Sequence, residues 1–433
     1  MRKARFWCVV ILTVVLVASL SPIASPENSP AGRHWVSAWS AAVHTPLPFP
    51  GLPPAPVFEN QTIRLVVRPT IGGDRVRIRL SNAFGTAALT IGSAHIALTK
   101  DKSSIVPESD HALTFGGRPS VSIPPGAPIL SDAVDLKVAA FTEISVSLYL
   151  PDKTPSSTYH FWGQHETYVS ETGDFTAKDM PNPTTKSSWY WLADVEVWAP
   201  DRAAATVAFG DSITDGVGAK QGAYADWPDM LANRLGDEKG APPLAVVNEG
   251  IGGNRVLYDG AGVSALARLD RDVLAQPGVK NLIILESIND IGWPHMKPPR
   301  PPNGEALREM PFVHQMVTAQ DLIMGMQQLI DRAHQHGIRV FGATLTPYEG
   351  AGYYSEDGEA TRQEVNRWIR TGGKFDGCFD FDAAVRDPDH PGMFLAAYDS
   401  GDHLHPSAAG FKAMAGVVDL DILRGKKRAP AKK

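Results

Sequence analysis

The chemistry of this sequence starts from a serine that follows a short apolar run. Ser212 comes directly after the run 207–209 and the pair Gly210-Asp211, and a glycine-rich stretch follows it. This pattern predicts a buried strand that delivers the serine to the edge of an α/β sheet, where ligand crevices form. The G-x-S-x-G signature of α/β-hydrolases is absent, because Thr214 occupies the position of its second glycine. Ser212 is a candidate nucleophile, and a plain turn or cap residue is the alternative.

A nucleophilic serine needs a base and a group that orients the base, and both residue types stand near the C-terminus. Asp402 and His405 are three residues apart, directly before Pro406 and a helical pattern. A turn at this place lets the carboxylate bind Nδ1 of the imidazole and leaves Nε2 free for a serine hydroxyl. We therefore expect His405 to be the general base and Asp402 its orienting group. A surface loop with two histidines, His403 and His405, is the alternative.

Two other stretches could donate hydrogen bonds to the oxyanion of an ester intermediate. The glycine-rich segment 250–253 follows a predicted strand, and a glycine lets a backbone N–H approach a ligand oxygen closely. Asn289 follows the next predicted strand, and its amide could serve as a donor or cap the following segment. For the glycines, an ordinary turn is the alternative. Two histidines could also form half of a metal site, but the sequence has no H-E-x-x-H motif and no cysteine cluster.

Taken in the order of the chain, the four stretches resemble the four sequence blocks of the SGNH or GDSL-type serine hydrolases, a family of lipases and esterases. The resemblance covers about residues 203 to 423. It implies that the oxyanion donors are the backbone N–H groups of Ser212 and Gly253 and the side-chain amide of Asn289. Gly253 is preferred to the neighbouring glycines because it lies five residues after Asn248. The resemblance also implies activity without a metal or an organic cofactor.

One residue departs from the family pattern. The third block commonly reads Gly-x-Asn-Asp, and Ser287 occupies its first position here. A Cβ and a hydroxyl at this place either crowd the acyl site or add a hydrogen bond. Asn289 itself is retained.

Further residues near the predicted mouth are candidates for substrate contact, with core packing as the alternative. Asp211, Arg255 and Trp293 are the three we select. Asp215 and Asp290 are expected to stabilise loops. The proline-rich segment 292–311 is long for a loop inside a domain, so we expect it to form a wall of the active site.

The periodicity of the chain predicts two domains that position these residues. Residues 31–200 alternate apolar and polar residues between turn signals, which predicts an all-β sandwich of jelly-roll type. Residues 203–423 alternate apolar strands with amphipathic helices, which predicts a doubly wound parallel sheet flanked by helices, as in SGNH or flavodoxin-like folds. The expected strands are 206–209, 244–248, 282–286, 340–345 and 378–381, and the expected helices are 227–235, 264–274, 319–334, 359–370 and 407–423.

The N-terminus predicts export. Three basic residues precede an apolar run of about 15 residues, 6–20, which is short for a bilayer span, and small residues follow. We interpret residues 1–25 as a signal peptide of a secreted or extracytoplasmic protein without a membrane span after its removal; an uncleaved anchor is the alternative. Cys378 would then be the only cysteine, so no intramolecular disulfide is possible. The basic tail 424–433 is expected to be disordered, and a net charge of −6 gives no reason to expect a nucleic-acid partner.

These observations together predict a secreted serine ester hydrolase with an accessory β-domain. Its expected substrate is an acylated carbohydrate, a lipid or a short-chain ester. An acyltransferase that uses the same residues is one alternative. A carbohydrate-binding protein with an inactive hydrolase half is another.

Overall fold

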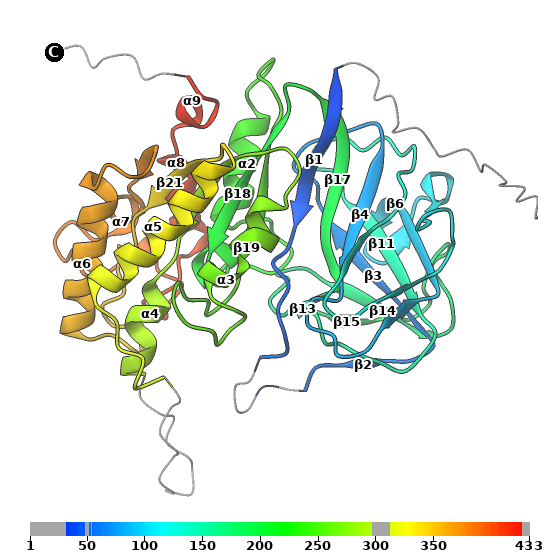
Figure 1. Cartoon of the computed structure of the whole chain (residues 1–433), viewed down its shortest axis with the longest axis horizontal. Helices are drawn as coiled ribbons and strands as arrows, with labels where there is room; N and C mark the ends of the chain where they lie inside the picture. Colours follow the sequence, from blue (N-terminus) through cyan, green and yellow to red (C-terminus); the bar gives the residue numbers. More distant parts are fainter. Residues whose placement is uncertain (1–31, 48–51, 53, 297–311, 427–433) are drawn as a thin grey trace, which may run out of the picture.

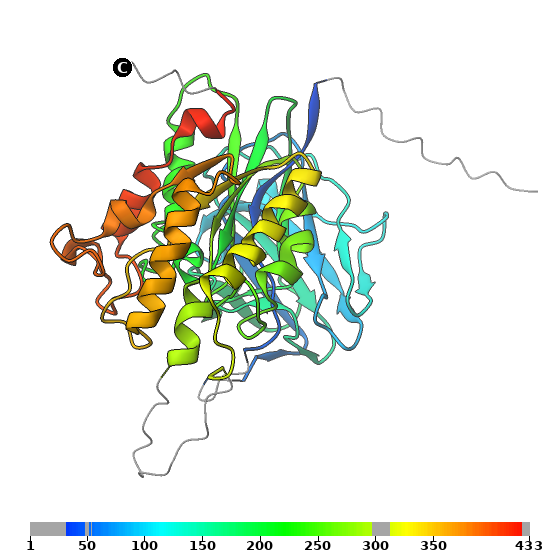
Figure 2. The ribbon, with the colours of Figure 1, turned by 60° about the vertical axis from the view of Figure 1, so that its left-hand side comes forward.

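The computed structural model of the protein describes residues 32–47, 52, 54–296 and 312–426. The predicted signal peptide, most of the predicted wall 292–311 and the end of the basic tail lie outside the described residues. Figure 1 and Figure 2 show two halves that lie side by side. One half is rich in β-strands, and the other contains the helices. Within the described residues, no helix has the length and apolar character needed to cross a membrane.

The C-terminal half is built on five parallel strands in the order β19-β18-β20-β21-β22. In sequence order this is 2-1-3-4-5, the order of flavodoxin-like sheets, whose topological switch lies between the first and third strands. Here the switch lies between β18 and β20, and ligands bind such sheets beyond the carboxyl ends of these strands. The five strands are β18 (Ala204–Gly210), β19 (Leu244–Gly250), β20 (Val279–Leu285), β21 (Arg339–Ala343) and β22 (Gly377–Phe379).

Helices cover both faces of this sheet because its strands are apolar on both sides. Val207 and Phe209 share a core with α3 and α5, whereas Ala208 between them packs with α2 and α8. The longest helices are α5 (Ala319–Gln335), α6 (Glu356–Thr371) and α2 (Trp227–Gly236); the shorter ones are α1 (Ser212–Asp215), α3 (Ala265–Leu269), α4 (Ile288–Gly292), α7 (Phe381–Val385), α8 (Ala408–Gly416) and α9 (Leu420–Leu423).

Several expected elements differ from the observed ones at their ends. The strand expected at 340–345 ends at Ala343, and the helix expected at 359–370 begins at Glu356. The helix expected at 264–274 is α3 followed by a π-helical turn, Asp270–Leu274. The helix expected at 407–423 is divided into α8 and α9, because the Asp419 side chain caps a new helix. The strand expected at 378–381 ends at Phe379, because Asp380 accepts a hydrogen bond from Ala383 and begins α7.

The N-terminal half consists mainly of two antiparallel sheets that share one core. Alternate residues of β4 and β3, such as Ile78 and Leu65, point into this core from the two sheets. The first sheet has the order β1 (Arg33–Ser40), β17 (Leu192–Pro200), β4 (Val76–Ser81) and β10 (Pro128–Leu130). The second has the order β15 (Thr184–Lys186), β14 (Thr167–Thr172), β3 (Gln61–Val67), β11 (Ile144–Leu150), β6 (Ser93–Asp101) and β7 (Ser104–Ile105), with β8 (His111–Ala112) also paired to β6. The jelly-roll connectivity stays a prediction.

The two halves meet along β1 and β19. Ala205 and Ala245 of the parallel sheet belong to the same buried cluster as the core of the N-terminal half. The Thr70 hydroxyl donates to the carbonyl of Val246 (3.0 Å) and accepts from its N–H (3.1 Å), so polar bonds also cross the interface. The chain passes from one half to the other at residues 201–203, between β17 and β18.

Candidate active site

Ser212 lies at the carboxyl end of β18, beside the topological switch of the sheet. The Asp211 carboxylate accepts the N–H of Ile213 (3.0 Å) and thereby caps the short helix α1, of which Ser212 is the first residue. The strand must end in Gly210, because a Cβ there would lie 2.2 Å from the carbonyl oxygen of Leu285. N–H groups in the first turn of a helix have no acceptor within the helix, which leaves the Ser212 N–H suitable for a ligand oxygen.

The loop before α8 brings an imidazole to this serine. Nε2 of His405 lies 2.8 Å from Oγ of Ser212, and Nδ1 lies 2.6 Å from Oδ2 of Asp402. Oδ1 of Asp402 accepts the backbone N–H groups of Leu404 (3.0 Å) and His405 (2.8 Å). Partial burial raises the pKa of Asp402, but the hydrogen bonds from His405 and Leu404 outweigh it and hold the pKa well below its ordinary value. The neighbouring His403 pairs instead with Asp399 (2.6 Å).

The segments predicted to supply oxyanion donors are joined to each other and to the serine strand. The N–H of Ile251 donates to the carbonyl of Gly210 (3.0 Å), which links the second block to the first. Nδ2 of Asn289 donates to the carbonyl of Asn254 (3.0 Å), which links the third block to the second. An amide nitrogen carries two hydrogens, so a second donor remains on Asn289.

Gly253 adopts a backbone conformation that requires glycine. Its φ is +82°, and a Cβ would lie 2.9 Å from the Trp293 ring and 3.0 Å from Cβ of Ala261. A residue with a side chain would therefore be strained and would also displace its neighbours. The loop 250–253 can pass close to α1 only with this composition, since a Cβ on Gly250 would lie 2.3 Å from the backbone nitrogen of Asp215.

Tyr353 orients the Asn289 amide, and nothing in the sequence pattern pointed to it. Its hydroxyl donates to Oδ1 of Asn289 at 3.2 Å, so Nδ2 faces the opposite way, toward Asn254. Burial raises the pKa of Tyr353 well above its ordinary value, which keeps the phenol protonated as a donor. Tyr353 lies 64 residues after Asn289, and no motif spacing links the two.

Ser287 occupies a position where a glycine would be relaxed. Its φ is 116° and its ψ is −18°, a left-handed conformation that is costly for a residue with a Cβ. The Oγ atom is buried and has no hydrogen-bond partner among the described residues. The hydroxyl therefore adds no hydrogen bond there.

Arg268 is a second residue that the sequence patterns did not identify. Its fully buried guanidinium donates to the carbonyls of Gly210 (2.8 Å) and Glu249 (2.7 Å) and to Oδ1 of Asn254 (2.8 Å). One cation thus fastens the ends of β18 and β19 and the loop after β19. The available signal was an arginine on the apolar face of a predicted helix, between Ala265 and Leu269.

The three residues selected for substrate contact are buried around the site. Asp211 is 1% exposed, and burial raises its pKa to about 7. The Arg255 guanidinium lies over the Trp293 ring, 4.7 Å from its centroid, and only 1% and 4% of these residues are exposed. Arg255 and Trp293 are therefore both buried below the surface. The Trp293 ring packs against the backbone of Gly253.

Asp290, which we expected to stabilise a loop, accepts two backbone hydrogen bonds from the segment that follows Gly253. They come from the N–H groups of Val256 (2.7 Å) and Leu257 (3.0 Å). Burial raises the pKa of Asp290 to about 6, and the two N–H donors limit that rise. The carboxyl group thus holds the segment that follows Gly253.

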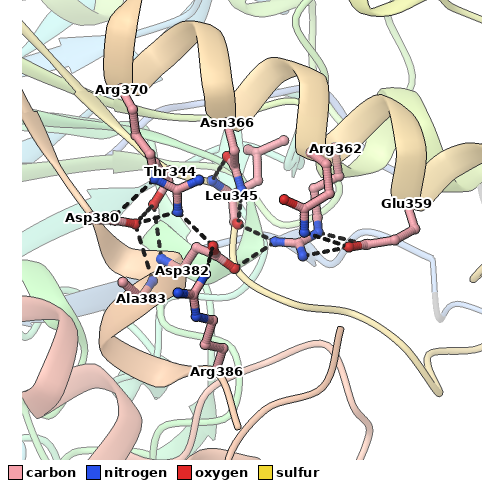
Figure 3. Close-up of polar contacts among 11 residues, drawn as sticks. Thr344, Leu345, Glu359, Arg362, Asn366, Arg370, Asp380, Asp382, Ala383 and Arg386 are labelled. Carbon is pink, nitrogen blue, oxygen red and sulfur yellow. Dashed lines mark hydrogen bonds and ion pairs between the residues drawn. The ribbon is translucent and has the colours of Figure 1, made fainter. Parts of the chain in front are cut away.

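A buried ion network supports the far side of the site. Arg362 on α6 donates to the carbonyl of Leu345, just beyond β21, and to Asp382 at the start of α7, at 2.7 and 2.9 Å (Figure 3). Arg370 and Arg386 also bind Asp382, as Figure 3 shows. The network fixes the loop after β21, which leads to Tyr353.

Comparison with known protein families gives one match. The GDSL-like lipase/acylhydrolase family matches residues 208–413. No curated protein sequence matches the chain. Among the described residues, no group of three or more histidine, cysteine, aspartate or glutamate side chains could hold a metal ion.

Similar solved structures include three esterases. An aryl esterase from M. smegmatis has a TM-score of 0.37 and 17% identity, over 51% of this chain and 97% of its own. A carbohydrate acetylesterase from Sinorhizobium meliloti has a TM-score of 0.35 and 17% identity, over 49% of this chain and 94% of its own. A mutant acetyl-xylooligosaccharide esterase from Geobacillus has a TM-score of 0.36 and 22% identity, over 52% of this chain and 95% of its own.

The matched region begins inside β18, four residues before Ser212, and ends inside α8, eight residues after His405. It therefore includes all four blocks. The chain contains a GDSL-like lipase/acylhydrolase domain, and the protein is a carboxylic ester hydrolase.

Proposed function

We propose that the protein hydrolyses esters through an acyl-enzyme on Ser212. The observation that carries the proposal is the continuous chain of hydrogen bonds from Asp402 through His405 to the Ser212 hydroxyl. Nε2 of His405 takes the proton from Oγ as Oγ attacks the ester carbonyl. The ionised Asp402 holds the other ring nitrogen and stabilises the imidazolium that forms. His405 then gives the proton to the departing alcohol.

Three donors stabilise the negative charge that develops on the carbonyl oxygen. They are the N–H groups of Ser212 and Gly253 and the free amide hydrogen of Asn289. Donors fixed in place before the reaction lose little free energy to reorganisation, so each contributes strongly. Water, activated by His405, then attacks the acyl-enzyme and releases the acid and Ser212.

The proposed substrate is an acylated carbohydrate, a lipid or a short-chain ester. We also propose that the protein acts outside the cytoplasm, in view of the basic and apolar N-terminus. Activity on acetylated sugars, short aryl esters and lysophospholipids, measured side by side, separates the substrate classes. N-terminal sequencing of protein recovered from the culture medium tests export and finds the cleavage site.

Substitution of the proposed nucleophile and base tests the mechanism. Ser212→Ala and His405→Ala should each lower kcat by about 10⁴-fold or more. His403→Ala is the matched control, because His403 belongs to the same loop but pairs with Asp399, and it should retain most activity. Ester turnover at the wild-type rate in Ser212→Ala would refute the proposal.

A further inference from the structure

A polar chain runs from the β-rich half into the loop that carries Gly253. His160 ends the short strand β13 (Tyr159–His160) and is 3% exposed. Its Nε2 lies 2.9 Å from Oδ1 of Asp215, the last residue of α1. The other oxygen of Asp215 accepts the N–H of Gly252 at 2.8 Å. Two hydrogen bonds thus connect the sandwich to the residue next to Gly253.

Both ring nitrogens of His160 face acceptors. Nδ1 lies 2.8 Å from the carbonyl oxygen of Ala42, and Nε2 faces Asp215. Two acceptors require a hydrogen on each nitrogen, so the geometry is that of an imidazolium. Burial lowers the pKa of His160, but the charge and hydrogen bond of Asp215 outweigh it, and the net shift is upward. The contact is a buried ion pair, in which the side chains of His160 and Asp215 are 3% and 4% exposed.

The same segment also packs directly on the loop. A Cβ on Gly252 would lie 2.1 Å from Cε3 of Trp162, so the indole lies against the bare backbone of Gly252. Trp162 is two residues after His160 and belongs to the sandwich half. The loop is therefore held by Asp215 through its N–H and covered by the Trp162 ring.

We propose that His160 is a positioning residue for ester hydrolysis, which holds the Gly253 loop through the Asp215 carboxylate. The inference rests on the proposed function, because it takes the Gly253 N–H as an oxyanion donor. Two glycines in succession, Gly252 and Gly253, have no side chains of their own to fix the loop. A displacement of about 1 Å at a catalytic group can lower the rate by about 100-fold, so a contact that fixes this backbone affects the reaction.

Through this arrangement the β-rich half helps to position an active-site loop. The sandwich supplies the cation that orients Asp215, and Asp215 lies one turn after Ser212 on the same helix. The Asp215 carboxylate therefore joins α1, which begins with Ser212, to the Gly253 loop. The sandwich is then part of the active-site framework, in addition to any role in binding substrate.

The test is the kinetics of His160→Gln and Asp215→Asn in the full chain. Each should lower kcat about tenfold or more and leave KM within about twofold, since the lost interaction acts on the transition state. The rate of inactivation by an organophosphonate ester, which forms a tetrahedral adduct on serine, should fall by a similar factor. The double variant should be no slower than the slower single variant, because both changes break one chain of contacts.

Thr70→Val is the matched control. It removes the hydrogen bonds between Thr70 and Val246 at the same interface but does not touch the loop. It should lower the unfolding midpoint and leave kcat unchanged when activity is measured well below that midpoint. A purely structural His160 would behave in the same way.

Wild-type kcat in folded Asp215→Asn or His160→Gln would overturn the inference. Asp215→Asn keeps the shape of the side chain, so it provides the answer if His160→Gln does not fold. If Ser212→Ala is inactive while these variants keep full kcat, the inference alone fails. If Ser212→Ala is active, the proposed function fails first.

Discussion

The Tyr353 hydroxyl donates to Oδ1 of Asn289 at 3.2 Å, and this bond sets which way the amide points. Asn289→Ala removes the proposed donor and should lower kcat by about 100-fold or more. Tyr353→Phe removes only the orienting bond, so we expect a loss of about five- to tenfold in kcat with KM little changed. Steady-state kinetics on one ester measures both variants.

The neighbouring tyrosine provides the control for this prediction. Tyr354 packs against the Tyr348 ring, and no hydrogen bond links it to Asn289. Tyr354→Phe should therefore keep wild-type kcat. Equal losses in Tyr353→Phe and Tyr354→Phe would contradict the orienting role of Tyr353.

Ser287→Gly should stabilise the protein by about 1 kcal/mol. The substitution relaxes a residue at φ 116° and removes a buried hydroxyl without a partner, and these gains exceed the extra backbone entropy of glycine in the unfolded chain. For a domain of this size, the midpoint should rise by roughly 2–4 °C in calorimetry.

Ser264→Gly is the control for this change. Ser264 has a φ of −56° and makes no capping hydrogen bond through its side chain. Glycine relieves no strain there and should be neutral or destabilising. A lower midpoint for Ser287→Gly than for the wild type would show that the hydroxyl does have a stabilising role.

Asp382→Asn should destabilise the protein by about 3 kcal/mol or more. Asp382 is fully buried and its charge faces Arg362, Arg370 and Arg386 (Figure 3). The substitution removes this buried negative charge and leaves the fully buried Arg362 paired with Glu359. Chemical denaturation of the two proteins measures the difference. Asp421→Asn is the comparison, because its pair with Lys426 is about 65% exposed and its loss should leave the midpoint unchanged.

Asp211→Asn should change how stability depends on pH. Burial raises the pKa of Asp211 to about 7, whereas the unfolded chain has an ordinary value of about 3.9. Between these values the folded state binds more protons than the unfolded state, so the Asp211 contribution to stability falls as pH rises. The variant cannot titrate there, and its stability relative to the wild type should increase from pH 5 to pH 8.

Asp132→Asn should show no such trend. Hydrogen bonds from Thr114 and Gly117 lower the pKa of Asp132, so its contribution is fully present above about pH 4 and is lost only in acid. The stability difference from the wild type should be constant between pH 5 and pH 8. A constant difference for Asp211→Asn as well would contradict the raised pKa.

Local patterns in the sequence predicted the strands and the longer helices of the C-terminal half, though not all of their ends, and they also marked the four blocks. Apolar runs such as 207–209 and 282–285 are typical of strands buried on both faces, and Ser212 and Asn289 follow these runs by three and four residues. Because parallel strands present their carboxyl ends at one edge, the order of the blocks already indicated a shared site. Asp402 and His405 are three residues apart, so their spacing allowed the contact within one turn that the structure has, with a surface loop as the alternative.

The tertiary structure decided which distant side chains support that site. Arg268, Tyr353 and His160 act through contacts across loops and across the interface of the two halves, and no periodicity marks such contacts. It also decided that Arg255 and Trp293 are buried, because burial depends on what packs over a loop. Sequence spacing reports neighbours along one element, whereas the positions of the Gly253 loop and the Asn289 amide depend on residues from other elements.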